Sequence, residues 1–392
     1  MKYIAKMMLA LLASVTLVIP AYAWDFSASG SMEATFNSTS IKKTKDGNSA
    51  SAGGFKSDGG AIVLSSSHSE GDKSATFKYT ADWDGNLDQL LNVSGTSKVG
   101  KWTGSASVEY NIGETATGQQ QTGADAGGIS LTDGNMTIKL GEHGHLANQN
   151  VSTNSSAGAS KTMESADYDG GIGAMVGSFH GVSYGQKLGD GMSFTVAYQN
   201  SGDESDLLGG MDWIDGETAG VYGSSGFGVS LNMAAGPASI GATVGSASTQ
   251  DNSGAGGSLK TTASAMGLGV KIDMGDMKPF ISFGSNTIKG DSTSSERSHG
   301  GIEAGLTMAM GSDTVIVYVG NLDEKNGAND EPTKYTMLEL GYNTTVGPAS
   351  LKLGYGSRTT ADSDGASSTN SADGYEDGGT YSDIDVTMSM SF

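Results

Sequence analysis

The chain has 392 residues, of which 61 are glycine, five are proline and none is cysteine, so disulfides and thiolate chemistry are excluded. The glycines follow no three-residue period, which excludes a collagen-like fibre. The 43 acidic residues outnumber the 22 basic ones and give a net charge of −21. This balance argues against nucleic acid as a partner and predicts a surface that attracts cations.

The N-terminal segment predicts export. Two lysines precede an apolar run over residues 7–19, and the small-x-small pattern Ala-Tyr-Ala follows at residues 21–23. The run is too short to span a membrane and ends at a cleavage pattern, as in a secretory signal peptide. We therefore expect residues 1–23 to be removed, which leaves residues 24–392 as one mature domain.

Apolar side chains then occupy every second position over successive segments, which is the period of a half-buried β-strand. The clearest segments are 26–36, 75–83, 102–112, 227–233, 266–274, 302–310, 338–342 and 384–392. We count about 18 strands, with 16 as the alternative, because the pattern is weakest at 91–98 and 218–234. Almost no segment of the sequence shows the 3.6-residue period of an α-helix.

The connections between these strands alternate between two classes. The short ones are Gly-, Asp-, Asn- and Pro-rich clusters typical of tight hairpins. The long ones are Gly-, Ser-, Thr-, Asn- and Asp-rich, at 38–58, 114–127, 143–178, 201–217, 248–260, 287–299, 322–334 and 359–379. Short turns at one end and long loops at the other are typical of a membrane barrel with periplasmic turns and extracellular loops. The architecture of a soluble β-sandwich does not require short turns at one end and long loops at the other.

The last strand shows the two faces most clearly. Ile384, Val386, Met388, Met390 and Phe392 alternate with acidic and hydroxyl residues. In a soluble sandwich the apolar face would meet a second sheet, whereas in an outer membrane it would meet lipid and the polar face would line a lumen. A barrel of 16 to 18 strands is too wide to fill with its own side chains. The predicted fold is therefore an all-β, transmembrane antiparallel barrel with an aqueous lumen.

These features resemble the general porins of Gram-negative bacteria. The resemblance rests on the export signal, the alternation of short turns and long loops, the terminal strand ending in Phe392, and the hairpin ISLTDGNMTIKLGE at 129–142. It implies an outer-membrane channel for passive diffusion of small hydrophilic solutes and ions, assembled as a homotrimer. It also implies that the loop 143–178 folds into the lumen, and that Phe392, Met390 and Met388 form the signal read by the outer-membrane assembly machinery.

The chain departs from the porin pattern in two ways. Residues 91–112 insert an extra pair of strands before the hairpin. Porins set a cluster of arginines on the wall opposite the acidic loop, whereas this chain has only Arg297 and Arg358, and we expect both to lie in long loops. A basic wall would therefore have to be built from lysines.

The candidate pore constriction joins acidic loop residues to lysines of the wall. Glu164, Asp167 and Asp169 of the loop would attract cations, and the alternative is an ordinary solvated loop. Lysines at lumen-facing positions would form the opposite wall or would simply be solvated: Lys78, Lys139, Lys187, Lys271 and Lys352. Lumen-facing acids include Glu33, Asp82, Glu109, Glu339, Asp383 and Asp385. The excess of acids predicts weak cation selectivity.

Other chemistry receives little support from the sequence. His143 and His145 form a His-x-His pair without evident further ligands, so we predict no metal site and no cofactor. A divalent cation held by the acidic loops is left open. No catalytic arrangement stands out, and we do not expect an enzyme. A second function is left open, in which the acidic loops of a surface barrel act as an adhesin, a receptor or a structural coat.

Overall fold

The computed structural model describes residues 24–43, 49–83, 87–111, 123–146, 178–189, 191–201, 222–251, 259–290, 297–325, 333–361 and 379–392. Within these ranges the chain forms 18 β-strands. They are β1 (Asp25–Lys43), β2 (Ser49–Glu70), β3 (Lys73–Trp83), β4 (Leu87–Val99), β5 (Trp102–Asn111), β6 (Gly123–Thr132), β7 (Met136–Gly144), β8 (Ser178–Gly189), β9 (Met192–Ser201), β10 (Tyr222–Ala235), β11 (Ala238–Asp251), β12 (Leu259–Ile272), β13 (Met277–Lys289), β14 (Arg297–Met310), β15 (Asp313–Lys325), β16 (Thr333–Val346), β17 (Ala349–Ala361) and β18 (Gly379–Ser391). The signal peptide predicted at 1–23 lies outside the described residues.

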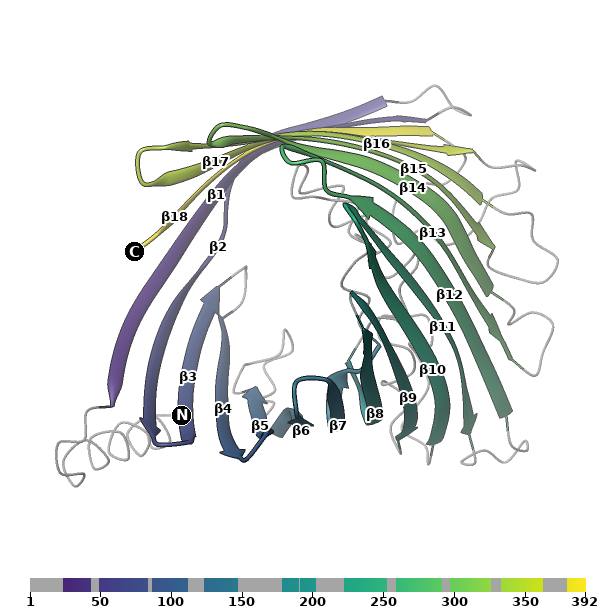
Figure 1. Cartoon of the computed structure of the whole chain (residues 1–392). Coiled ribbons are helices and arrows are strands. Elements are labelled where there is room, and N and C mark those ends of the chain that lie inside the picture. Colours follow the sequence, from purple (N-terminus) through teal and green to yellow (C-terminus); the bar gives the residue numbers. More distant parts are fainter. Residues whose placement is uncertain are drawn as a thin grey trace.

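The strands form one closed antiparallel barrel. Each strand pairs with its neighbours in the chain, and β1 also pairs with β18, from Ser31 opposite Ser391 to Lys43 opposite Gly379. Figure 1 shows the strands following one another round a ring, with β16 and β17 on the side opposite β5 to β8. The predicted all-β barrel is confirmed with 18 strands, and β4 and β5 are the extra pair expected from the sequence. Among the described residues no helix is long and apolar enough to cross a membrane.

The two faces of the sheet differ as the alternation predicts. In β18 the side chains of Ile384 and Met388 are 52% and 54% exposed on the outside, whereas Asp383 and Asp385 are 1% and 2% exposed on the inside. The same split recurs round the ring, where large apolar side chains form the outer surface: Phe77, Leu131, Leu140, Val196, Leu231, Leu268, Phe283, Val319 and Leu340. An outer surface of this composition is suited to lipid.

Short turns join the strands at one end of the barrel. The turn between β6 and β7 is organised by Asp133, whose Oδ1 accepts the backbone N–H groups of Met136 at 2.8 Å and Asn135 at 3.0 Å. Lys101 Nζ, from the neighbouring turn, lies 3.0 Å from Asp133 Oδ2. The Met136 amide, the lysine and the Asn135 amide together lower the pKa of Asp133 to about 2. The turn therefore keeps its charge well below neutral pH.

Several strands continue into segments that we expected to be long loops. The hairpin of β1 and β2 pairs as far as Lys42 opposite Ser49, so most of 38–58 is strand. The prediction for the two arginines was also wrong, since Arg297 is the first residue of β14 and Arg358 lies within β17. The Ser-, Thr- and Gly-rich composition predicted loops, but pairing with the adjacent strand satisfies the backbone groups whatever the composition.

The seam of the barrel has a specific contact at the C-terminus. The N–H of Phe392 donates to Gly30 O at 2.9 Å, and the N–H of Gly30 donates to Phe392 O at 2.8 Å. The phenyl ring lies over Gly30, because a Cβ built there would stand 2.5 Å from the ring atoms Cε2 and Cζ. Glycine at position 30 therefore provides the space in which the terminal ring packs.

We predict that Gly30→Leu weakens the seam by about 1 kcal/mol, because the new side chain displaces the Phe392 ring. The measurement is the fraction of heat-modifiable barrel formed on refolding into lipid vesicles. Ala28→Leu, on the same outer face of β1, is the control and should fold normally. The double variant Gly30→Leu with Phe392→Ala should fold as well as Phe392→Ala alone; additive losses would show that the two residues act independently.

The direction of the side chains in β5 gives a second prediction. Val108 faces outward in the middle of the strand, and its neighbour Ser107 faces the lumen. A lysine facing lipid near the midplane costs about 2–4 kcal/mol, so Val108→Lys should reduce the folded fraction strongly. Ser107→Lys should leave folding intact, since its charge stays in water. Equal losses in the two variants would contradict the assignment of the faces.

Candidate functional site: the wall of the lumen

The inner face of β14 to β18 carries a group of buried carboxylates that we call the acidic wall. Its members are Glu303 on β14, Glu339 on β16, and Asp383 and Asp385 on β18, each no more than 2% exposed. Glu339 and Asp383 stand on either side of Gly356, which pairs with both of them and places no side chain between them. Four carboxylates are thereby gathered on one side of the barrel.

Hydrogen bonds hold two of these carboxylates in place. Ser282 Oγ donates to Glu303 Oε1, and the hydroxyl of Tyr318 donates to Glu303 Oε2 at 3.1 Å. Asn37 Nδ2 on β1 donates to Asp385 Oδ1 at 2.6 Å. The last bond crosses the seam of the barrel, so part of the acidic wall exists only because β1 and β18 meet.

Arg358 lies among the acidic wall residues. It is 4% exposed, its guanidinium carbon is 5.3 Å from the centre of the Tyr335 ring, and it pairs across the sheet with Met337 and Tyr381. The sequence argument that wall cations must all be lysines is therefore wrong. Arg358 thus lies on the same inner face as the four carboxylates of the acidic wall, and carboxylates outnumber cations among these buried residues.

The chain enters the lumen directly after β7. Within β7, Gly141 has a φ of 93°, and a Cβ there would lie 2.4 Å from Gly127 O, so only glycine suits this position. Five residues later Leu146 is 2% exposed, packs with Ala197 of β9, and lies over Gly228 of β10. The first described residues of the loop predicted at 143–178 therefore lie on the inner wall.

His145 fastens this segment to the wall. Its Nε2–H donates to Gly141 O at 2.9 Å, and its Nδ1 lies 2.8 Å from Ser183 Oγ of β8. His143 Nε2–H donates to Ile129 O at 3.2 Å. Among the residues that the structure describes, no group of three or more His, Asp or Glu side chains could hold a metal ion. The contacts of the His-x-His pair fit a structural role.

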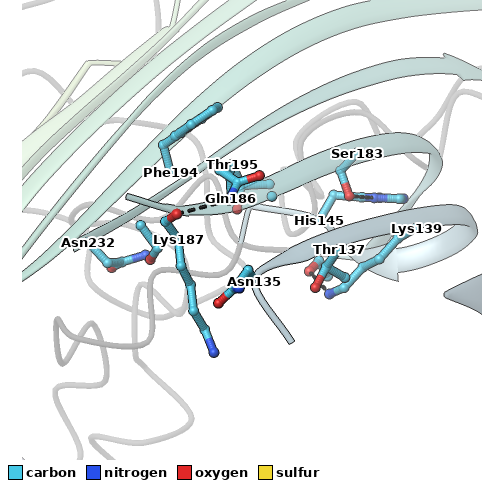
Figure 2. A pocket seen from close by; sticks show the side chains of 13 residues that line it. Asn135, Thr137, Lys139, His145, Ser183, Gln186, Lys187, Phe194, Thr195 and Asn232 are labelled. Carbon is cyan, nitrogen blue, oxygen red and sulfur yellow. Dashed lines mark hydrogen bonds between the residues drawn. The ribbon is translucent and has the colours of Figure 1, made fainter. Parts of the chain in front are cut away.

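A cavity of about 350 Å³ lies beside this segment, and Figure 2 shows the side chains of the residues that line it, most of which belong to the inner face of the wall. They come from the turn before β7 and from β7 to β10: Asn135, Thr137, Lys139, His145, Ser183, Gln186, Lys187, Ser193, Phe194, Thr195 and Asn232. The lining contains two lysines and no carboxylate. We call it the basic pocket.

The acidic wall and the basic pocket lie on opposite sides of the ring. In an 18-stranded barrel, eight strands lie between β7 and β16, or between β8 and β17, in either direction. Figure 1 shows this separation round the ring. The pocket lysines lie within a few residues of the short turns, whereas Glu339 lies near the middle of β16. The four buried carboxylates and the two pocket lysines are thus on opposite sides of the ring, although other lumen-facing charges, such as Lys352 on β17 and Glu109 on β5, are not divided in this way.

The structure places the predicted constriction residues in different positions. Lys139 and Lys187 share the basic pocket, whereas Lys78 lies on β3, away from it. Met388 and Met390 lie on the outer face beside the terminal Phe392. The acids predicted in the loop, Glu164, Asp167 and Asp169, lie outside the described residues, so their role stays a prediction.

Glu303 was missed as a candidate by the sequence argument. Its position between Ile302 and Ala304 gives it lumen-facing parity, so the signal was present in the alternation. The partners Ser282 and Asn37 were missed for another reason. They lie on other strands, and only the register of the closed sheet brings them to the carboxylates.

Of three comparisons with known proteins, only the one with solved structures gives matches. No protein-family model matches the sequence, and no curated protein sequence matches it. Several solved structures are similar. An anion-selective porin from Comamonas acidovorans has a TM-score of 0.55 and 16% identity, over 94% of this chain and 100% of that one.

Two further structures agree. The outer-membrane channel DcaP of Acinetobacter baumannii has a TM-score of 0.52 and 14% identity, over 95% of this chain and 99% of that one. The outer-membrane protein OmpT of Vibrio cholerae, in a trimer form, has a TM-score of 0.51 and 9% identity, over 94% and 100%. The chain therefore has the fold of the bacterial outer-membrane porins, and the low identities show the fold alone.

We predict that His145→Ala releases the start of the loop without opening the barrel. Loss of two hydrogen bonds of about 1 kcal/mol each should speed amide hydrogen exchange of residues 141–146 by roughly tenfold or more. Exchange in β12 to β16 should be unchanged. His68→Ala, on β2 and far from the loop, is the control. Unchanged exchange at 141–146 would show that His145 does not hold the segment.

Proposed function

We propose that this protein is a water-filled channel for passive diffusion of small hydrophilic solutes and ions through an outer membrane. The observation that carries the proposal is a closed ring with apolar side chains outside and charged side chains inside. Eighteen strands spaced about 4.8 Å apart and tilted by about 40° make a ring about 36 Å across between backbones. Side chains alone do not fill a ring of this width. No catalytic role is part of the proposal.

The route to the membrane follows from the two ends of the chain. We propose that residues 1–23 direct export and are cleaved. The assembly machinery would then recognise the apolar outer face formed by Met388, Met390 and Phe392. The trimer form of the structurally similar OmpT supports a homotrimer here. No bound cofactor is part of this proposal.

We propose a weak preference for cations. The described inner surface has four buried carboxylates on the same side of the ring as Arg358, and the lysines of the basic pocket lie on the opposite side. The chain as a whole is also negative, with a net charge of −21. A low-dielectric wall focuses this field into the lumen. Screening over about 8 Å at physiological salt limits the effect to a preference.

The test is the reversal potential of single channels in a planar bilayer under a KCl gradient. The wild type should pass K⁺ more readily than Cl⁻. The triple variant Glu339→Gln, Asp383→Asn, Asp385→Asn should move the reversal potential toward anions. The shift should shrink at 1 M salt, where screening shortens to about 3 Å. Heat-modifiable migration on gels confirms that each variant is folded.

A matched control removes three acids from the rim of the barrel. Glu70→Gln, Asp72→Asn, Asp276→Asn changes the net charge equally, but these exposed residues lie at the short turns. It should shift the reversal potential much less. A wild type that prefers Cl⁻, or equal shifts in the two triple variants, would overturn the assignment to the acidic wall. Absence of any conductance from folded protein would overturn the channel itself.

The loop acids form a separate part of the proposal. Neutralising Glu164, Asp167 and Asp169 together should also move the reversal potential toward anions, if the loop narrows the pore. Comparison with the acidic-wall variant separates the two contributions. An unchanged potential in the loop variant, beside a shifted one in the wall variant, would assign selectivity to the wall alone.

A further inference from the structure

The basic pocket is built differently from the rest of the lumen wall. Its floor is the row Thr137, Gly185 and Thr195, in which Gly185 is the central position and has no side chain. A Cβ built at Gly185 would be 3.3 Å from Thr195 Oγ1 and no closer to any other atom. The hollow therefore exists because residue 185 is glycine, and a larger side chain would fill it without blocking the backbone.

A lysine stands on each side of this floor. Lys139 and Ser183 form the row on one side, and Lys187 and Ser193 form the row on the other. The two rows are four residues apart along β8, which separates their Cα atoms by about 13 Å. Figure 2 shows the side chains of Lys139 and Lys187 to either side of Asn135. The distance suits a solute several atoms long whose anionic group binds one lysine at a time.

Lys139 is held in a defined position. It is half-buried, and its Nζ donates to Gly144 O at 3.2 Å. An ammonium group has three N–H donors, so two are available toward the cavity. Lys187 is exposed, and its backbone N–H donates to Asn135 O at 2.8 Å, which ties β8 to the short turn. Both cations sit on rigid strands of the wall.

Uncharged polar groups cover the space between and beyond the lysines. Asn232 Oδ1 is buried at the edge of the pocket and accepts no hydrogen bond from the described residues. The hydroxyls of Ser230 and Thr243 on the neighbouring strands β10 and β11 are likewise buried without a hydrogen-bond partner within the described part of the chain, but neither residue lines the pocket. Buried groups of this kind are costly unless something bonds to them.

We propose that the basic pocket is a binding site for a small hydroxylated anion, a carboxylate or phosphate ester of about sugar size. The anionic group binds Lys139 or Lys187, and the solute's hydroxyls bond to Asn232 and the threonines of the floor. A volume of about 350 Å³ is enough for a solute of this class. The pocket lies on the inner wall near the short turns, so the solute would bind there during its passage through the barrel.

The test is isothermal titration calorimetry on the folded barrel in detergent, which does not depend on conductance. The probes are gluconate and glucose 6-phosphate, and the tighter one identifies the preferred anionic group. Glucose and acetate test the hydroxyl and anionic parts separately, and both should bind at least about tenfold more weakly. Glucose or acetate binding as tightly as the probes would overturn the proposal, as would the absence of binding heat from both gluconate and glucose 6-phosphate.

Three variants locate the site. Lys139→Gln with Lys187→Gln should weaken probe binding about tenfold or more, whereas Lys271→Gln with Lys352→Gln removes two lumen lysines elsewhere and should not. Gly185→Val keeps every charge and fills the floor, so it should abolish binding. If the two double-lysine variants lost the same amount of probe affinity, the effect would come from the overall charge of the lumen, and the assignment of the site would be wrong. Unchanged probe binding in Gly185→Val would also show that the assignment of the site is wrong. KCl conductance should persist in all three variants, so failure here is distinguishable from failure of the channel proposal.

Discussion

Hydrocarbon offers no hydrogen-bond partner to a backbone amide, and this constraint organises the whole chain. A sheet can lie in lipid only if every strand has two neighbours, so the first and last strands must meet. Here β1 pairs with β18 over thirteen residue pairs, and Phe392 extends that pairing by two further bonds to Gly30. The long alternating strands, the apolar outer face and the polar inner face all follow from closing the ring in this way.

Closure also creates the chemistry of the lumen. The bond from Asn37 to Asp385 joins residues at opposite ends of the chain, and the bond between Thr35 and Thr387, at 2.7 Å, does the same. One carboxylate of the acidic wall, Asp385, is therefore held by a residue across the seam. Because charged residues are costly on the outside, they collect inside, as the four carboxylates of the acidic wall and Arg358 do.

Glycine has a second role beyond the turns. Gly30 leaves space for the Phe392 ring, Gly141 lets β7 approach the backbone of Gly127 closely, and Gly185 leaves the floor of the basic pocket open. The volume that a side chain would occupy is taken by the Phe392 ring at Gly30, by the backbone of Gly127 at Gly141, and by the open cavity at Gly185. The high glycine content of the chain thus reflects close packing against the wall as well as hairpin formation.

The sequence by itself determined the fold class, the direction of each side chain and nearly the number of strands. These depend on a two-residue period that can be read locally, as in Ile384 to Phe392. The lengths of the strands, the place of Arg358 and the partners of Glu303 and Asp385 were decided by the tertiary structure. They depend on register and closure, which bring together residues far apart in the chain. The basic pocket belongs to the same class, since a hollow at Gly185 becomes visible only when the rows on either side of it are placed.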